Sequence, residues 1–226
     1  MSTRKKRAFR LDLTPSVFRI SILCPLTRLV VFRAQRTATP TLPIMLRYYY
    51  LTWFSQPAAD RSIYQAIANR PLRSIVEIGV GTGVRTKRLF ELAVKPEHAH
   101  EPLQYTGIDL FEARPAKTPG MKLKTAFTTL QTDHVKVRLV PGDPYSALAR
   151  MANTLPNIDL IVISADQPAE SLAQAWRYVP RMICPETLVF LERPEKKAGE
   201  TKFELLKATE VQRLAIASNK AIRKAA

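Results

Sequence analysis

The stretch Ser74-Ile-Val-Glu-Ile78, followed by Gly79-Val-Gly-Thr-Gly83, decides how the whole sequence is interpreted. Its first five residues form a short apolar run that is typical of a buried strand, and a helical pattern follows over 85–94. Glycine accepts positive φ and has no Cβ, so a ligand can approach the backbone of such a turn closely. Glycine turns after strands are also purely structural, and the loop alone leaves both interpretations open.

Beyond this loop, apolar runs alternate with helical patterns. Strands are expected over 104–109, 135–140, 158–163 and 187–191, and helices over 121–132, 145–152 and 169–179. Continuous apolar strands separated by helices predict a mainly parallel sheet that is covered on both faces. Right-handed crossovers then give a doubly wound, three-layer α/β fold of the Rossmann-like type, whose ligands bind at the carboxyl ends of the strands.

The end of the chain leaves room for only a reduced C-terminal strand region, because 34 residues follow Glu192 (226 minus 192). A strand over 201–206 and a helix over 210–217 are expected there. The domain is therefore expected to span residues 45–217, with 218–226 as a basic tail. A helix that opens at 57–60 and ends before Pro71 precedes the glycine loop.

The composition is that of one ordinary domain. The chain has 226 residues, of which 46% are apolar and 24% charged, so it can bury a core and is not globally disordered. Its two cysteines, Cys24 and Cys184, stand far apart without a CxxC pair. A disulfide scaffold and a structural zinc site are therefore not expected, and a reducing, cytoplasmic compartment is the default.

Half of the net charge of +16 lies in residues 1–44, which hold nine Lys or Arg and one acid (nine minus one gives +8). Arg19, Pro25 and Arg28 interrupt the apolar stretch 17–32, so no membrane span is expected. We expect a basic, disordered leader that is dispensable for folding and ligand binding. An organellar targeting signal and an anion-binding tail remain the alternatives.

Acidic residues follow three of the expected strands. Asp109 ends 104–109, Asp143 follows 135–140 and Asp166 follows 158–163. Because the carboxyl ends of parallel strands meet at one edge of a sheet, these carboxylates should lie near the glycine loop. A carboxylate at Asp109 can accept hydrogen bonds from both hydroxyls of a ribose. The structural alternatives are a solvated loop acid for Asp109 and helix-capping or turn roles for the other two.

The Glu77-to-Gly83 loop, together with Gly107-Ile-Asp109, Gly142-Asp143 and the stretch 158–166, resembles the class I S-adenosylmethionine-dependent methyltransferases over roughly residues 70–193. The resemblance implies S-adenosyl-L-methionine as the cofactor and methyl transfer as the activity. It implies a ribose contact for Asp109 and a place near the adenine amine for Asp143. The methionine moiety would be lined by Glu77, Gly79, Gly81 and Gly83. A sulfonium cation next to Glu77 and Asp109 is also electrostatically favourable.

The acceptor side departs from the better-known branches of this family. Ser164 and Glu192-Arg193 stand where metal-dependent O-methyltransferases carry acidic and Asp-Asn residues, so no catalytic metal is expected. Neither the Asp/Asn-Pro-Pro-Tyr box of N-methyltransferases nor a well-placed nucleophilic cysteine is present, because Cys184-Pro185 precedes the fifth expected strand. A small-molecule O or N acceptor is therefore expected, with Asp166 as base or acceptor-orienting group. No acceptor motif supports nucleic acid.

Two other functions remain open on the sequence alone. One is a non-catalytic module that binds S-adenosylmethionine, and the other is an NAD-dependent oxidoreductase. The second is disfavoured because Val84 stands where the dinucleotide fingerprint has Gly or Ala. His98-Ala-His100 is interpreted as an exposed loop rather than a metal site. The aromatic run Tyr48–Tyr50 with Trp53-Phe54 is interpreted as N-terminal packing rather than as a lid.

Overall fold

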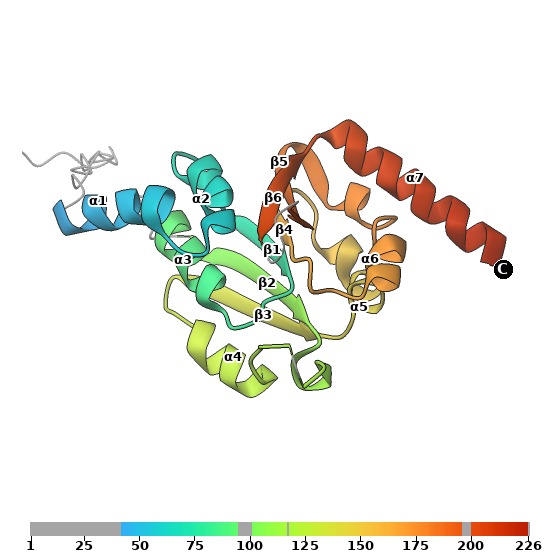
Figure 1. Ribbon diagram of the computed structural model, residues 1–226, viewed down its shortest axis with the longest axis horizontal. Helices are drawn as coiled ribbons and strands as arrows, with labels where there is room; N and C mark the ends of the chain where they lie inside the picture. Colours follow the sequence, from blue (N-terminus) through green and yellow to red (C-terminus); the bar gives the residue numbers. More distant parts are fainter. Residues whose placement is uncertain (1–41, 95–100, 117, 196–199, 226) are drawn as a thin grey trace, which may run out of the picture. The chain divides into compact units, whose positions relative to one another are not determined.

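A computed structural model describes residues 42–94, 101–116, 118–195 and 200–225. They form a six-stranded sheet in the order β3-β2-β1-β4-β5-β6, with helices on both faces (Figure 1). The strands are β1 (Ser74–Ile78), β2 (Leu103–Asp109), β3 (Val135–Pro141), β4 (Ile158–Ile163), β5 (Ile183–Pro194) and β6 (Thr201–Leu206). Strands β1 to β5 are parallel, and β6 pairs antiparallel with β5. The predicted doubly wound, mainly parallel three-layer fold is thus confirmed.

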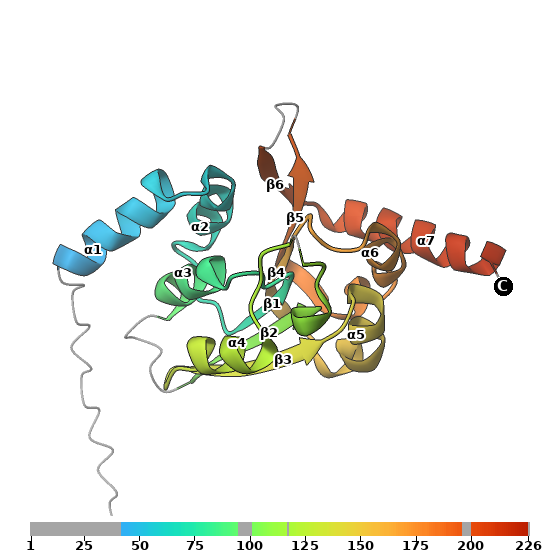
Figure 2. The same ribbon diagram turned by 60° about the horizontal axis from the view of Figure 1, so that its bottom comes forward.

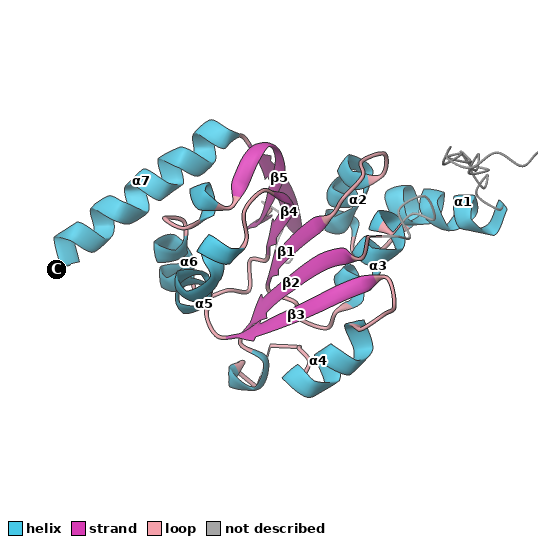
Figure 3. Ribbon diagram, turned by 180° about the vertical axis from the view of Figure 1, so that it is seen from behind, coloured by secondary structure: helices cyan, strands magenta, loops and turns pink. Residues whose placement is uncertain are grey.

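The helices form two layers, one on each face of the sheet (Figure 3). One layer contains α2 (Arg61–Ile67), α3 (Val84–Ala93) and α4 (Leu123–Leu130), and α1 (Leu42–Tyr49) joins it through the π-helical turn η1 (Tyr50–Phe54). The other layer contains α5 (Pro144–Met151), α6 (Ala169–Ala175) and α7 (Ala208–Ala225). Four short 3₁₀ turns complete the described elements: η2 (Ala58–Asp60), η4 (Phe111–Ala113), η5 (Ala152–Thr154) and η6 (Val179–Arg181).

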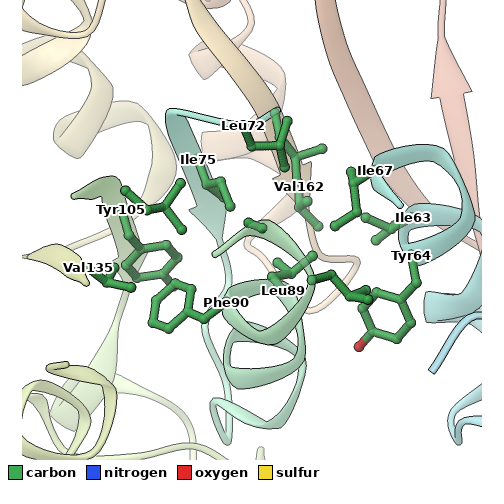
Figure 4. Packing of buried hydrophobic residues seen from close by; sticks show 14 of the residues in the cluster. Ile63, Tyr64, Ile67, Leu72, Ile75, Leu89, Phe90, Tyr105, Val135 and Val162 are labelled. Carbon is green, nitrogen blue, oxygen red and sulfur yellow. The ribbon is translucent and has the colours of Figure 1, made fainter. Parts of the chain in front are cut away.

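Two hydrophobic cores result from the alternation of side chains along the strands. In β1, Ile75 packs into the core under α2 and α3, whereas its neighbour Val76 packs into the core under α5, α6 and α7. Figure 4 shows the first core, in which Phe90 of α3 packs edge-on against Tyr105 of β2 and Leu89 lies toward Tyr64 of α2. Both faces of β1 are therefore dry, which explains its continuous apolar sequence.

The strand order reverses direction at β1, whose two neighbours are β2 and β4. In an open α/β sheet, this switch point leaves a crevice at the carboxyl ends of the strands. The loop after β1 and the loop after β4 both lie at this edge, where the amide of Ser164 donates to Ile78 O (2.9 Å). Beside them, β5 and β6 form an antiparallel pair that extends beyond the rest of the sheet (Figure 2).

Both expected domain boundaries fall within helices. Helix α7 continues past residue 217 to Ala225, and the buried Ser218 donates to Gln174 O (2.9 Å). Much of the segment expected as a tail is thus helical. Helix α1 begins at Leu42, three residues before the expected start of the domain, while residues 1–41 of the expected leader lie outside the described residues. In the described part of the chain, no helix has both the length and the apolar character needed to cross a bilayer.

The N-terminal aromatic residues do not all pack in the way that the sequence suggests. Tyr48 packs against the first core, and Leu51 is buried in it. In contrast, the other four aromatic residues are exposed, namely Tyr49, Tyr50, Trp53 and Phe54. The packing interpretation therefore describes one side of this helical segment. An ion pair from Arg47 of α1 to the last turns of α3 (Glu91, 3.0 Å) places α1 at the end of α3 opposite to the glycine loop.

Candidate functional site

The glycine loop forms a tight turn between β1 and α3 in which all three glycines have positive φ. The amide of Gly79 donates to Ile108 O of β2 (2.8 Å), so the loop is fixed to the sheet. A Cβ at Gly79 would lie 2.7 Å from Ser164 Cβ, and that side of the loop is therefore closed. A Cβ at Gly81 would meet no atom within 4 Å. The loop thus presents open space beside Gly81.

Asp109 ends β2 next to this open space and is almost completely buried (1% exposed). The amide of Gly81 donates to its Oδ2 (2.8 Å), and the amide of Phe111 donates to its Oδ1 (3.2 Å). The guanidinium of Arg114 also binds both carboxylate oxygens at 2.6 Å. Although burial alone would raise the pKa of Asp109, the hydrogen bonds from Arg114 and Gly81 lower it below its ordinary value. The structure therefore brings Asp109 to the glycine loop, as expected, but already paired.

Arg114 is the most important site residue that sequence reasoning missed. Its side chain is 6% exposed, and it bridges Asp109 and Asp166, with 2.7 Å from Arg114 Nη1 to Asp166 Oδ2. A Cβ at Gly120 would lie 2.6 Å from Arg114 Cδ, so the chain after Arg114 packs directly on its side chain. The hydrogen bonds with Asp109 raise the pKa of Arg114 and keep it charged. A cation five residues after an acid, with a 3₁₀ turn between, forms no recognised sequence pattern.

Glu77 lies on the far side of the glycine loop from the open space. It is fully buried and accepts hydrogen bonds from Arg85 Nε (2.8 Å), Thr86 Oγ1 (2.6 Å) and Tyr105 Oη (2.7 Å). All three donors lie between the sheet and α3. Burial and the charge of Glu77 raise the pKa of Tyr105 well above its ordinary value, so the phenol stays a donor. Glu77 thus supports the loop from behind rather than presenting its carboxylate to the open space.

Arg85 connects Glu77 to three other parts of the site. Its Nη2 donates to Gly79 O (2.9 Å) and to Ser164 Oγ, and its Nη1 lies 3.8 Å from Asp60 Oδ1. Burial alone would lower the pKa of Arg85, but the charges of Glu77 and Asp60 raise it. Asp60 is itself buried, which raises its pKa against the influence of Arg85. The sequence indicated Asp60 only as part of a helix start, and its place in this cluster was missed.

Asp143 is the N-cap of α5. The amide of Ser146 donates to Asp143 Oδ2 (3.2 Å), and the hydroxyls of Ser146 and Ser171 also donate to the carboxylate. Burial acts to raise the pKa of Asp143, but these hydrogen bonds outweigh it and lower the pKa to about 2. The helix-capping role that the sequence left open for Asp143 is therefore present. A contact with an adenine amine stays a prediction.

Replacing Asp143 with alanine is expected to lower the free energy of unfolding by about 1 kcal/mol at neutral pH, because the N-cap is lost. The folded-state pKa of about 2 lies below the ordinary value. The stabilisation is thus fully present above about pH 4 and is lost as the pH falls toward about 2. Urea unfolding at several pH values should show the two proteins converging over this range. Asp133→Ala, at an exposed site on the α4–β3 turn, is the control. A pH-independent difference would contradict the assignment.

Asp166 lies beside Gly79 at the end of β4, with its side chain 34% exposed. Its Oδ2 pairs with Arg114, and its Oδ1 accepts a hydrogen bond from Gln167 Nε2 (2.8 Å). The N-cap position of α6 is occupied by Pro168, so Asp166 does not cap that helix. Glu192 holds the same loop, because its carboxylate accepts a hydrogen bond from the amide of Ala165 (3.0 Å). In the sequence, Glu192 was noted only for standing where metal-dependent O-methyltransferases carry an Asp.

Within the described ranges, no group of three His, Cys, Asp or Glu is arranged to hold a metal ion. His98 and His100 lie outside those ranges, as does Cys24. Cys184 is half-buried within β5, and the hydroxyl of Thr187 lies 3.4 Å from its sulfur. The sequence placed Cys184 before the fifth strand, and the structure corrects this, because β5 already begins at Ile183.

No protein-family model matches this sequence, and no curated protein matches it. Among solved structures, the chain is similar to a precorrin 8w decarboxylase from Methanobacterium thermoautotrophicum (21% identity, TM-score 0.39, covering 61% of this chain and 63% of that one). It is also similar to a SAM-dependent methyltransferase from Thiobacillus denitrificans in complex with S-adenosyl-L-homocysteine (11% identity, TM-score 0.40, covering 69% and 56%). A third similar structure is a TehB-like SAM-dependent methyltransferase from Corynebacterium glutamicum (16%, 0.42, 77% and 78%). The chain thus spans less than two thirds of the first two proteins.

Proposed function

We propose that this chain binds S-adenosyl-L-methionine and transfers its methyl group to a small molecule through an oxygen or nitrogen acceptor, without a metal ion. The observation that carries the proposal is the open space beside Gly81, directly next to the Asp109 carboxylate. A ligand that enters this space meets the glycine backbone on one side. On the other side it meets a carboxylate of the kind that accepts hydrogen bonds from ribose hydroxyls. This is the arrangement that a nucleoside needs at the switch point of a doubly wound sheet.

The local charge favours a cationic ligand over a pyrophosphate. Five carboxylates, from Asp60, Glu77, Asp109, Asp166 and Glu192, lie around the loop together with the guanidinium groups of Arg85 and Arg114. Both guanidinium groups are bound to carboxylates, and Lys87 lies on the exposed face of α3. A sulfonium group gains from this negative surplus, whereas a pyrophosphate would be repelled. The donor set therefore fits S-adenosylmethionine.

Each site residue has one role in the proposed reaction. The backbone at Gly81 and the carboxylate of Asp109 bind and orient the nucleoside, and Glu77 with Arg85 keeps the loop rigid from behind. Bound S-adenosylmethionine supplies an electrophilic methyl group. Asp166, partly exposed at the neighbouring strand end, orients the acceptor or takes its proton. Asp143, which follows β3 and caps α5, lies near the adenine amine in this proposal.

The geometry of the site also bears on two alternative functions. A non-catalytic module that binds S-adenosylmethionine is favoured by one observation, namely that Asp166 is held by Arg114 and Gln167. An NAD-dependent oxidoreductase is disfavoured, because Val84 at the first residue of α3 carries an exposed branched side chain where the fingerprint has Gly or Ala. We also propose a cytoplasmic location, which rests on the cysteine usage.

The experiment that tests the proposed activity is transfer of a labelled methyl group from S-adenosylmethionine to a panel of acceptors. We expect label in one or more small hydroxyl or amine compounds and none in RNA or DNA. The rate should be the same with and without a chelator, because the Ser164 and Glu192-Arg193 positions lack the expected metal ligands. Loss of activity with the chelator and recovery with magnesium would contradict metal independence. Binding without transfer to any acceptor would favour the non-catalytic module.

A further inference from the structure

The carboxylate of Asp109 has no acceptor position left for a ribose. Its Oδ1 accepts from Arg114 Nε and from the amide of Phe111, and its Oδ2 accepts from Arg114 Nη2 and from the amide of Gly81. A carboxylate offers about four lone-pair positions in total. All four are used by the protein itself. Two of the donors are backbone amides, which the loop structure fixes. The other two are guanidinium nitrogens of the Arg114 side chain.

We propose that Arg114 is a gate on the site, which must withdraw from Asp109 before the hydroxyls of a nucleoside can bind there. The inference rests on the proposed function, because it takes the Asp109 edge as the ribose position. The same guanidinium binds Asp166 through Nη1 (2.7 Å). One movement of Arg114 would therefore free Asp109 to bind the nucleoside and Asp166 to act on the methyl acceptor.

The surroundings of Arg114 confine such a movement to its outer side, because its Nη1 also donates to Pro119 O (3.2 Å) and its Cδ packs against Gly120. Its outer anchor, Asp166, is partly exposed, whereas its inner anchor, Asp109, is almost fully buried. The guanidinium can therefore exchange its contact with Asp166 for solvent as it leaves Asp109. A hydroxyl pair then replaces two charge-assisted hydrogen bonds at the same oxygens. The withdrawn position also places a cation beside the acceptor, where it can bind an anionic group of that molecule.

A gate and a permanent structural ion pair make different predictions about ligand binding. If the closed state dominates, the apparent dissociation constant exceeds the intrinsic one by the inverse of the open fraction. Removing the guanidinium then tightens binding, although it weakens the fold by leaving Asp109 unpaired. A permanent ion pair that only orients Asp109 gives the opposite result, because its removal loosens the carboxylate and weakens binding.

The test compares Arg114→Gln with the wild type by calorimetry and stopped-flow, with S-adenosyl-L-homocysteine and NAD as probes. We expect Arg114→Gln to bind S-adenosylhomocysteine at least about tenfold more tightly, as for an open fraction of one tenth or less. The observed association rate of the wild type should saturate with ligand concentration at the opening rate, and that of the variant should stay linear. Arg47→Gln removes a guanidinium from the exposed ion pair with Glu91 and should change neither quantity.

Asp166→Asn provides a second variant if Arg114→Gln folds poorly, because it weakens the outer anchor of Arg114 and leaves Asp109 intact. It should also tighten binding. Equal or weaker binding of S-adenosylhomocysteine by a folded Arg114→Gln protein overturns the gate and leaves the proposed function standing. Tighter binding of NAD but not of S-adenosylhomocysteine supports the gate and overturns the proposed function. No binding of either probe, even by the folded variant, overturns both.

Discussion

Replacing Arg85 with methionine is expected to lower the free energy of unfolding by about 3–5 kcal/mol, the usual loss when one partner of a buried ion pair is removed. The side chains of Glu77 and Asp60 are 0% and 4% exposed, so water cannot replace the guanidinium. The glycine loop also loses its tie from Arg85 to Gly79 O. Chemical denaturation followed by circular dichroism measures the change.

The matched control is Arg47→Met, which breaks an ion pair whose side chains are 52% and 43% exposed. Exposed pairs contribute about 0–1 kcal/mol, and the control should lose no more than that. The double variant Arg85→Met/Glu77→Gln should recover part of the stability, because the uncompensated charge at Glu77 is gone. Equal losses for the Arg85 and Arg47 variants would contradict the buried cluster.

A side chain at Gly81 is expected to weaken ligand binding about 10- to 100-fold. It should affect the fold only through backbone strain at its φ of 58°. The Cβ would enter space that is free of protein atoms, so the protein does not have to move. The ligand would meet that side chain instead, at a cost of about 1–3 kcal/mol for overpacking. Binding of S-adenosylhomocysteine to Gly81→Ala and Gly81→Asn measures the effect.

The two Gly81 variants separate steric blocking from backbone strain. The φ of Gly81 is 58°, a left-handed conformation that asparagine tolerates better than alanine. Asparagine is also the larger side chain. If the open space is the ligand site, Gly81→Asn binds more weakly than Gly81→Ala and is the more stable of the two. If backbone strain alone were responsible, alanine would be worse in both measurements.

The sheet could be predicted from sequence because its strands carry local signals. The bounds of β1, β4 and β6 match the expected ranges, since each is a short apolar or alternating run with clear ends. Strand β5 begins four residues before its expected start, at Ile183, because pairing with β4 through a register shift extends it. Helix α7 extends past its expected end because Ser218 is buried and donates to Gln174 O in α6, a contact that a local pattern does not reveal.

The site could be predicted only where strand ends decide the geometry. The glycine loop and Asp109 meet because β1 and β2 are parallel neighbours, which the alternating pattern indicates. The partners that control those residues were not predictable, because Arg114 and Arg85 act through contacts between separate elements. The buried position of Glu77 follows from its place on the α3 face of β1, which it shares with Ile75. An acid on the dry face of a central strand needs buried partners, and that signal was available in the sequence.

The proposed nucleoside site is best tested by calorimetric titration of the wild-type protein and of Arg114→Gln with S-adenosyl-L-homocysteine, with NAD as the competing candidate. We expect one S-adenosylhomocysteine to bind per chain in both proteins, S-adenosylmethionine to displace it, and NAD not to bind. Heat from NAD in either protein, with none from S-adenosylhomocysteine in both, would contradict the proposed site.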